Sequence, residues 1–274
     1  MMSKTSCGRS MIYTYSINLA GPSHIEQGAP CQDSFFVKRN RQGIVIAAVA
    51  DGLASGQHSE IGSYIAAYTA SYYCADRIQK DMDSEAAQET LKEAFRQADS
   101  AVKQKAAADN LDPNQYETTL CLAVYDGKNV YYGQAGDSGI LVLLENGEYR
   151  AVTDQQRDEE KRVFPLGWDT EKWEFGYVKE PVSAVLLMTD GVYELVCPLE
   201  AENERYIDAE VADKFIRSFD ITEQELSGLQ EASRSYLENP PVVLDDDKTL
   251  LVLINTDRKP MLCAEKNADG IVCR

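Results

Sequence analysis

Short apolar segments along the chain predict a series of β-strands. Some of them alternate apolar and polar residues, and others are continuous apolar runs, which are typical of strands that are buried on both faces. The segments that we interpret as strands are residues 13–18, 44–50, 119–125, 130–134, 140–144, 185–188 and 250–254. The dipeptides Asp126-Gly127 and Asn146-Gly147 between neighbouring strands are typical of hairpin turns, so we expect antiparallel sheet.

Longer segments with helix-favouring composition and end signals predict four α-helices. They are residues 59–78 and 84–108 and, with less definite ends, 208–218 and 222–237. These helices come in pairs and do not alternate with the strands. That order favours an α+β layered sandwich over a doubly wound parallel sheet.

We expect one compact domain over residues 1–255. A hydrophobic content of 44% in 274 residues is enough to build a sizeable core. Within the domain, a polar and charged segment near 153–175 is interrupted by Pro165 and Gly167, which predicts a long loop or a small flap. Residues 256–274 have no clear periodicity, and we interpret them as a C-terminal tail.

The composition excludes several classes of partner. A formal net charge of -18 disfavours nucleic acid and anionic membranes, because both reward patches of Lys and Arg. The longest apolar runs are too short to cross a bilayer, and the first twenty residues lack the apolar stretch of a signal peptide. The 7 cysteines form no C-x-x-C pair and only 2 histidines accompany them, which favours reduced thiols over a zinc site. We therefore expect a soluble, cytoplasmic protein.

Aspartates stand at the ends of several predicted strands. Asp51 follows residues 44–50, Asp137 follows 130–134, Asp190 follows 185–188, and Asp246 precedes 250–254. A single Asp-Gly dipeptide after a strand is usually only a turn. Several carboxylates at the rims of buried strands repel one another, however, unless a cation lies between them. Oxygen ligands without His or Cys favour Mg²⁺ or Mn²⁺.

The sequence lacks the motifs of side-chain nucleophiles. It has no cysteine loop of the tyrosine-phosphatase kind, no G-x-x-x-x-G-K-[ST] phosphate loop and no G-x-S-x-G elbow. A pair of metal ions needs no such nucleophile, because the ions acidify a water and neutralise the leaving oxygen. Hydrolysis of phosphate esters is the reaction class in which such charge neutralisation contributes most.

The blocks around these aspartates resemble the metal-dependent protein phosphatases of type 2C, the PPM family of serine/threonine phosphatases. The resemblance covers roughly residues 13–255, and the pattern DGxxSxxxSEIGS is similar to a bacterial branch of that family. The blocks occur in the order of the family, and they read GAPCQDSF, VADGLASGQHSEIGS, ETTLCLAVYDG, GQAGDSG and LMTDGVYE, followed by DDDKTLLVL.

The resemblance implies a set of metal ligands. Asp51 resembles the aspartate that bridges both ions, and the carbonyl of Gly52 resembles a ligand of the second ion. Asp190 and Asp246 would hold the first ion. The family fold implied for the chain is a four-layer α-β-β-α sandwich of two antiparallel sheets flanked by helix pairs.

Two further aspartates have implied roles of their own. Asp33 resembles an acidic residue that supports the metal-bound waters, and Asp137, together with Asp190, resembles the pair that binds a looser third ion. In the family a water that bridges the metals attacks phosphorus directly. The resemblance thus implies a Mg²⁺- or Mn²⁺-dependent protein-serine/threonine phosphatase whose partners are a phosphorylated protein and a cognate serine/threonine kinase.

The chain departs from the family at four positions, and these keep other functions open. Gly28 stands where animal members have an arginine that grips phosphate, Leu53 where a histidine is frequent, and Gln32 and Gly139 replace a glutamate and an arginine. A non-catalytic relative that binds a phosphoprotein or a partner kinase is therefore the second hypothesis. A metal-dependent hydrolase of small phosphoesters is the third.

Two histidines and two threonines lie near the predicted site. His24 and His58 stand on polar segments, and either could act as an acid, although a surface histidine is the simpler interpretation because the sequence fixes no partner for them. Thr118 and Thr119 precede a predicted strand and fit a packing or turn role better than a chemical one.

Overall fold

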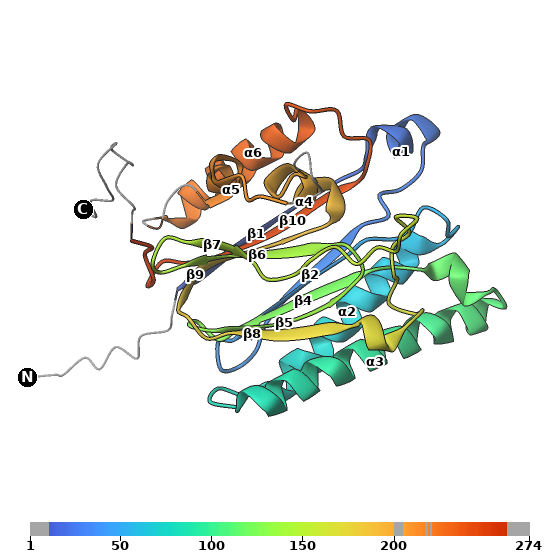
Figure 1. The fold of residues 1–274 in the computed structure, drawn as a ribbon, viewed down its shortest axis with the longest axis horizontal. Helices are drawn as coiled ribbons and strands as arrows, with labels where there is room; N and C mark the ends of the chain where they lie inside the picture. The colour runs from blue at the N-terminus through green and yellow to red at the C-terminus, as the bar shows by residue number, and fades with distance from the viewer. Residues whose placement is uncertain (1–10, 200–204, 217–218, 220, 262–274) are drawn as a thin grey trace, which may run out of the picture.

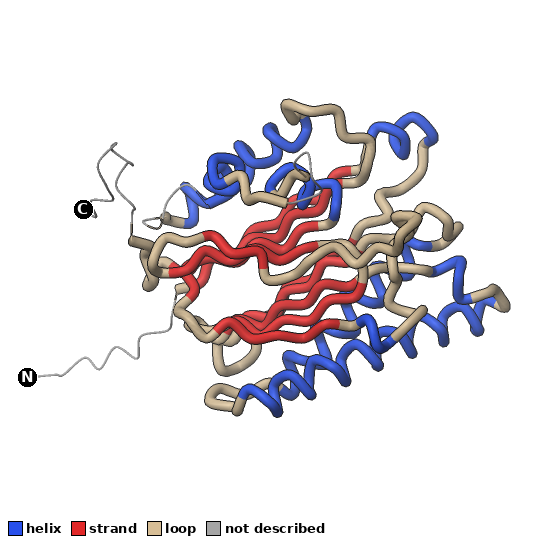
Figure 2. Tube along the Cα trace, viewed as in Figure 1, coloured by secondary structure: helices blue, strands red, loops and turns tan. Residues whose placement is uncertain are grey.

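The computed structural model describes residues 11–199, 205–216, 219 and 221–261 of the chain. Two antiparallel sheets of five strands each lie face to face, and helices cover both outer faces (Figure 1, Figure 2). The predicted α+β sandwich with four layers, α-β-β-α, is therefore confirmed.

In the first sheet, the first and the last strand of the described chain pair with each other. Its strands, in spatial order, are β1 (Ile12–Leu19), β10 (Lys248–Asn255), β9 (Val182–Met188), β6 (Gly139–Leu144) and β7 (Tyr149–Ala151). The helices α4 (Asp190–Val196), α5 (Ala209–Ile216) and α6 (Glu223–Glu238) lie on its outer face. Phe215 and Leu237 of these helices are buried in the same apolar cluster as Leu186 and Val252 of the sheet, so one cluster joins the two layers.

The second sheet is built from the first half of the chain together with one later strand. Its strands, in spatial order, are β2 (Ser34–Arg39), β3 (Val45–Ala50), β4 (Leu120–Tyr125), β5 (Val130–Ala135) and β8 (Glu174–Val178). The long helices α2 (Ser59–Arg77) and α3 (Ser84–Asp109) cover its outer face. Short helical segments connect the layers, namely α1 (Pro22–Gln27), η1 (Pro113–Tyr116) and η2 (Thr170–Lys172).

A third apolar cluster fills the space between the two sheets. Val49 of β3 and Val142 of β6 are among its members, and both are fully buried. Every residue of β3, β4, β6, β9 and β10 is buried, because these strands have a sheet partner or a helix on each face. This is the reason why they are continuous apolar runs in the sequence.

The predicted strands and helices are all present, but three strands, two α-helices and the short helices η1 and η2 were not predicted. The missed strands are β2, β7 and β8, and the missed α-helices are α1 and α4. The three missed strands lie at sheet edges or expose part of their residues, so their apolar pattern is weak. Helix α4 begins at Asp190-Gly191, a dipeptide whose sequence suggests a turn.

Several predictions fall partly outside the described residues. Residues 217–218 of a predicted helix and 262–274 of the predicted tail lie there, as do Cys7, Cys263 and Cys273. The other cysteines, Cys31, Cys74, Cys121 and Cys197, are free thiols. Within the described part of the chain, every helix is too short or too polar to cross a membrane.

Candidate metal centre

The register of the strands brings aspartates from both sheets to one end of the sandwich. In the second sheet Ser34 pairs with Ala50, so Asp33 and Asp51 extend from neighbouring strands at the same edge. In an antiparallel pair, one strand begins at the end of the sheet where its neighbour finishes. Residues that are far apart in the sequence therefore meet at that end.

The first sheet contributes the other aspartates by the same rule. Gly139 of β6 pairs with Met188 of β9, so Asp137 and Asp190 also reach this end of the molecule. Asp246 comes two residues before β10, whose neighbour is β9.

These aspartates line a cavity of about 610 Å³. One carboxylate oxygen each of Asp51, Asp137 and Asp190 lies within 4.8 Å of the other two. Asp246 and Gly52 line the same cavity, but the Asp246 carboxylate is not in this closest group and is more exposed. Asp33 does not line it and is buried beside it.

Three of the aspartates have a buried oxygen that makes no hydrogen bond to any described residue. These atoms are Oδ1 of Asp33, Asp137 and Asp190. The other oxygen of Asp33 accepts a hydrogen bond from the Thr189 hydroxyl at 2.7 Å. A buried carboxylate oxygen without a partner costs free energy, so such atoms indicate a ligand that the protein side chains do not supply.

Burial and mutual repulsion raise the pKa of these carboxyls. Burial is the largest cause for Asp51, whose pKa lies well above its ordinary value, and the neighbouring aspartates raise it further. The pKa of Asp33 is raised in the same way. The pKa of Asp190 rises to about 7, mainly through burial and then through the charges of Asp137 and Asp246. Perturbed carboxyls that gather in a cavity are typical of functional sites.

The backbone of Asp51 is fixed by two threonines. The amide of Asp51 donates to the Thr119 hydroxyl at 2.9 Å, and the Thr118 hydroxyl donates to the Asp51 carbonyl at 2.9 Å. Thr118 and Thr119 thus position the Asp51 backbone. Sequence reasoning gave them only a packing or turn role, because the contact joins β3 and β4, which are far apart in sequence.

Close backbone packing explains why glycines follow two of the aspartates. A Cβ on Gly52 would lie 2.6 Å from the Ser59 carbonyl oxygen, and one on Gly191 would lie 2.1 Å from that of Asp247. A side chain at either position would push the neighbouring segment away from the acidic group.

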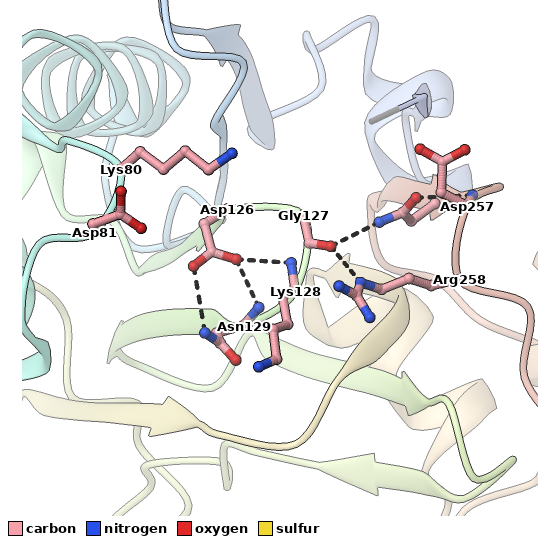
Figure 3. A pocket seen from close by; sticks show the side chains of 9 residues that line it. Lys80, Asp81, Asp126, Gly127, Lys128, Asn129, Asp257 and Arg258 are labelled. Atoms are coloured by element: carbon pink, nitrogen blue, oxygen red, sulfur yellow. Dashed lines mark hydrogen bonds between the residues drawn. The ribbon is translucent and has the colours of Figure 1, made fainter. Parts of the chain in front are cut away.

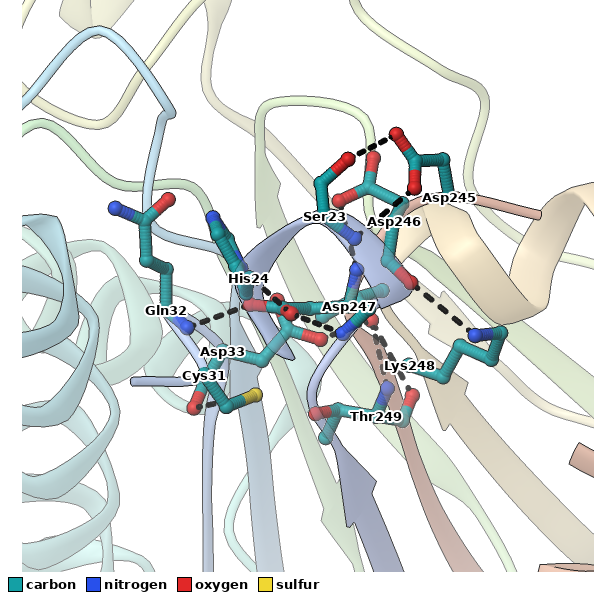
Figure 4. A network of polar contacts seen from close by, with 12 residues as sticks. Ser23, His24, Cys31, Gln32, Asp33, Asp245, Asp246, Asp247, Lys248 and Thr249 are labelled. Carbon is teal, nitrogen blue, oxygen red and sulfur yellow. Dashed lines mark hydrogen bonds and ion pairs between the residues drawn. The ribbon is translucent and has the colours of Figure 1, made fainter. Parts of the chain in front are cut away.

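Asp247 organises the rim of the cavity, and sequence reasoning assigned it no role (Figure 4). Its carboxylate is buried and accepts hydrogen bonds from the amides of Gly21 at 2.7 Å and Gln32 at 2.6 Å. The Nδ1 atom of His24 lies 2.8 Å from the same carboxylate. His24 lines the cavity, and its Nε2 atom makes no hydrogen bond to any described residue. His58 instead stacks on Tyr116 and precedes α2.

Arg157 is the other residue that sequence reasoning missed. Its Nη2 atom lies 2.7 Å from Oδ2 of Asp137, 3.0 Å from Oδ2 of Asp190 and 3.5 Å from Glu194. Arg157 belongs to the predicted flap, where other charged residues surround it in the sequence. Nothing in that pattern distinguishes it from a surface arginine.

A second large cavity lies beside the β4–β5 turn, at the other end of these strands from Asp51 and Asp137. Figure 3 shows residues that line it. It has a volume of about 550 Å³ and is lined by both cations and anions. Asp126 accepts from the amides of Lys128 and Asn129 at 2.7 Å each, and Arg258 donates to the Gly127 carbonyl. These bonds hold a hairpin turn in place, so this cavity is the weaker candidate for a metal site.

The residues of the acidic cavity fit hard divalent cations. Carboxylate oxygens from several strands converge there, Oδ1 of Asp33, Asp137 and Asp190 has no partner among the described residues, and one guanidinium, that of Arg157, offsets only part of the negative charge. The predicted ligands Asp51, Asp190, Asp137 and Gly52 are thus brought together, Asp246 lies at the rim, and Asp33 lies behind them.

Comparison with solved structures shows the same fold in bacterial phosphatases. A bacterial serine phosphatase superposes with a TM-score of 0.65 at 12% identity, over 89% of this chain and 98% of that chain. Stp1 from Staphylococcus aureus gives 0.63 at 12% identity, over 93% and 99%. The catalytic domain of PstP, in complex with two manganese ions, gives 0.60 at 18% identity, over 89% and 97%. No curated protein matches the sequence.

The solved structures show only that the fold is shared, whereas a match to a family model shows which family the chain belongs to. Residues 20–233 match the model described as protein phosphatase 2C, which is more than half of the chain. The matched region contains Asp33, Asp51, Asp137 and Asp190 and ends before Asp246. The chain belongs to the protein phosphatase 2C family.

Proposed function

We propose that the protein is a Mg²⁺- or Mn²⁺-dependent protein-serine/threonine phosphatase. The observation that carries this proposal is that one carboxylate oxygen each of Asp51, Asp137 and Asp190 lies within 4.8 Å of the other two, and that Oδ1 of Asp137 and of Asp190 is buried without a partner in the described chain. Family membership supports the reaction class. The manganese ions in the PstP structure support the choice of metal.

The aspartates hold the ions in this proposal. Asp51 would help to hold both ions, the carbonyl of Gly52 would bind the second, and Asp190 and Asp246 would bind the first, as the family resemblance implies. Asp33, fixed by Thr189, orients solvent at the centre. A bound pair of such ions lowers the pKa of water and neutralises charge on the phosphoryl group.

His24 supplies a proton donor at the rim of the cavity. In the doubly protonated ring, Nδ1–H would donate to the Asp247 carboxylate, and Nε2–H would give its proton to the leaving serine or threonine oxygen, which leaves a neutral imidazole. This role compensates for Leu53, which stands at the position where the family frequently has a histidine. It also gives a chemical reason for the buried position of Asp247.

The substrate is a phosphorylated protein, and a serine/threonine kinase is the partner that opposes the enzyme. We place both in the cytoplasm, and we take the domain to span residues 1–255 with a flap near 153–175 and a tail over 256–274. The cavity is open and polar, which suits a phosphorylated side chain presented on a protein surface.

A non-catalytic regulator with the same fold is the second candidate function. One observation favours it, namely that Gly28 ends helix α1 in a left-handed conformation, φ 66°, and so offers no side chain to grip phosphate. A regulator binds a phosphoprotein or kinase without turning it over, and it takes up one metal ion or none.

Hydrolysis of an aryl phosphate with and without Mn²⁺ tests the proposed function. We expect turnover that is lost in chelator and falls by at least about a hundredfold in Asp190→Asn, because the variant loses a metal ligand. Asp76→Asn is the matched control, since Asp76 is exposed on α2, and it should keep full activity. Absence of metal-dependent turnover on aryl phosphate and on phosphopeptides would leave the regulator as the surviving function.

A further inference from the structure

Arg157 contacts the acidic centre through two of its nitrogen atoms. The Nε atom donates to Oδ2 of Asp137 at 2.8 Å, and the Nη2 atom donates to Oδ2 of Asp190 at 3.0 Å. The Arg157 side chain is only 27% exposed. Charge-assisted hydrogen bonds of this kind are about twice as strong as neutral ones, and a partly buried guanidinium loses little of their strength to solvent.

The backbone around Arg157 is held in place and does not hang free in solvent. Gln156 donates its amide to the Gly136 carbonyl at 3.1 Å, and its side chain accepts from the Gly136 amide at 2.9 Å. Arg157 itself forms an isolated β-bridge with Val163. The segment that precedes Asp137 thus fixes the position of the arginine that binds Asp137.

The two carboxylates that bind the guanidinium of Arg157 also carry unpartnered oxygens. Arg157 binds Oδ2 of Asp137 and Oδ2 of Asp190, whereas Oδ1 of each makes no hydrogen bond within the described chain. One oxygen of each group therefore faces a protein cation, and the other remains for a ligand. The positive charge lies between the two aspartates that, by the family resemblance, would hold a looser third ion.

We propose that Arg157 takes the place of this third cation, so that the centre binds two metal ions and not three. The inference rests on the proposed function for its first two ions, but it concerns the number of ions and not catalysis. Two of the N–H-bearing nitrogens of Arg157 are already used by carboxylates, which argues against a primary role in gripping the substrate phosphate.

The stoichiometry of Mn²⁺ binding, measured by titration calorimetry and by the paramagnetic signal of free Mn²⁺, tests the inference. Wild type should bind two ions. Arg157→Gln keeps most of the side-chain length and removes the charge, and it should bind three. Arg157→Ala is the second variant with the same expectation, and circular dichroism establishes that each variant is folded.

Arg162→Ala is the matched control, because Arg162 lies in the same loop and its ion pairs within the described chain are with Asp158 and Glu160 and not with the aspartates of the centre. It should bind two ions. The double variant Arg157→Gln/Asp137→Asn should lose the added ion, with an affinity at least roughly tenfold weaker.

The outcomes separate this inference from the proposed function. Two ions in wild type and still two in folded Arg157 variants would overturn the inference alone, as would three ions in wild type. A raised KM in Arg157→Gln with an unchanged ion count would assign Arg157 to phosphate binding instead. A wild type that binds no ion would contradict both the inference and the proposed function.

Discussion

The carboxylates of the candidate metal centre repel one another, and the protein's own cations compensate only part of that repulsion. Burial and neighbouring aspartates raise the pKa of Asp33, Asp51 and Asp137 as well as that of Asp190, even though Arg157 lowers the pKa of Asp137 and Asp190 by its charge. In the absence of divalent cations these residues therefore oppose folding when they are ionised. The free energy of unfolding should reveal this through its pH dependence.

The metal-free protein should become less stable as the pH rises from about 5 to about 8. The folded Asp190, with a pKa of about 7, holds a proton that the unfolded chain has released above its ordinary pKa of 3.8. The contribution of this proton to the free energy of unfolding is complete below the ordinary pKa of 3.8 and is lost as the pH rises through 7. The loss is on the order of a few kcal/mol. Urea unfolding in chelator at several pH values measures it.

Two comparisons make this prediction specific. Asp190→Asn has no group that ionises at this position, so its free energy of unfolding should fall less steeply with pH. Saturating Mn²⁺ should reverse the trend, because the metal binds the ionised carboxylates. Stability in chelator that rises from pH 5 to pH 8 would contradict the assignment of raised pKa values to the folded centre.

The contribution of His24 to kcat should depend on the leaving group of the substrate. His24→Gln should lose about a hundredfold in kcat on phosphoserine peptides, whose alkoxide leaving group needs a proton. It should lose far less on an aryl phosphate, because a phenolate leaves without one. Parallel kinetics on both substrates measure the difference, with His58→Gln as control. An equal loss on both substrates would show that His24 acts on structure or metal binding and not as an acid.

At the scale of elements, the short helix α4 connects the end of β9 to the metal centre. Its first residue is Asp190, and Gly191 packs directly against the backbone that carries Asp246 and Asp247. No helical periodicity is visible here in the sequence, since the helix has 7 residues and begins with a dipeptide typical of turns. The long helices α2 and α3 and the buried strands were predictable, because their pattern extends over many residues.

Gly191→Ala should disturb this contact. The added methyl group would overlap the Asp247 carbonyl, which we expect to cost about 1–3 kcal/mol of stability and to weaken Mn²⁺ binding by separating Asp190 from Asp246. Gly228→Ala is the control, because nothing lies within 4 Å of a Cβ at Gly228 in α6. It should stabilise the protein by about 0.4–1 kcal/mol. Thermal unfolding and calorimetry measure both, and normal metal affinity in Gly191→Ala would argue against the role of α4.

At the scale of the whole molecule, the centre is assembled from both sheets. Asp33 and Asp51 come from the second sheet, Asp190 and Asp246 come from the first, and Asp137 lies on the connection from β5 of the second sheet to β6 of the first. The positions of these aspartates at strand ends were visible in the sequence, and their order matched the family. Arg157 and Asp247 were not predictable, because their roles depend on contacts with residues 20 or more than 200 positions away and no local pattern marks them.

Anomalous diffraction from crystals grown with Mn²⁺ would show whether the acidic cavity holds a pair of metal ions. We expect two anomalous peaks about 3.5–4 Å apart in the acidic cavity. A carboxylate of Asp51 should touch both ions, and Asp190 should touch one of them. Peaks elsewhere on the molecule, or an ordered acidic cavity with no peak at saturating Mn²⁺, would contradict the proposed pair of metal ions.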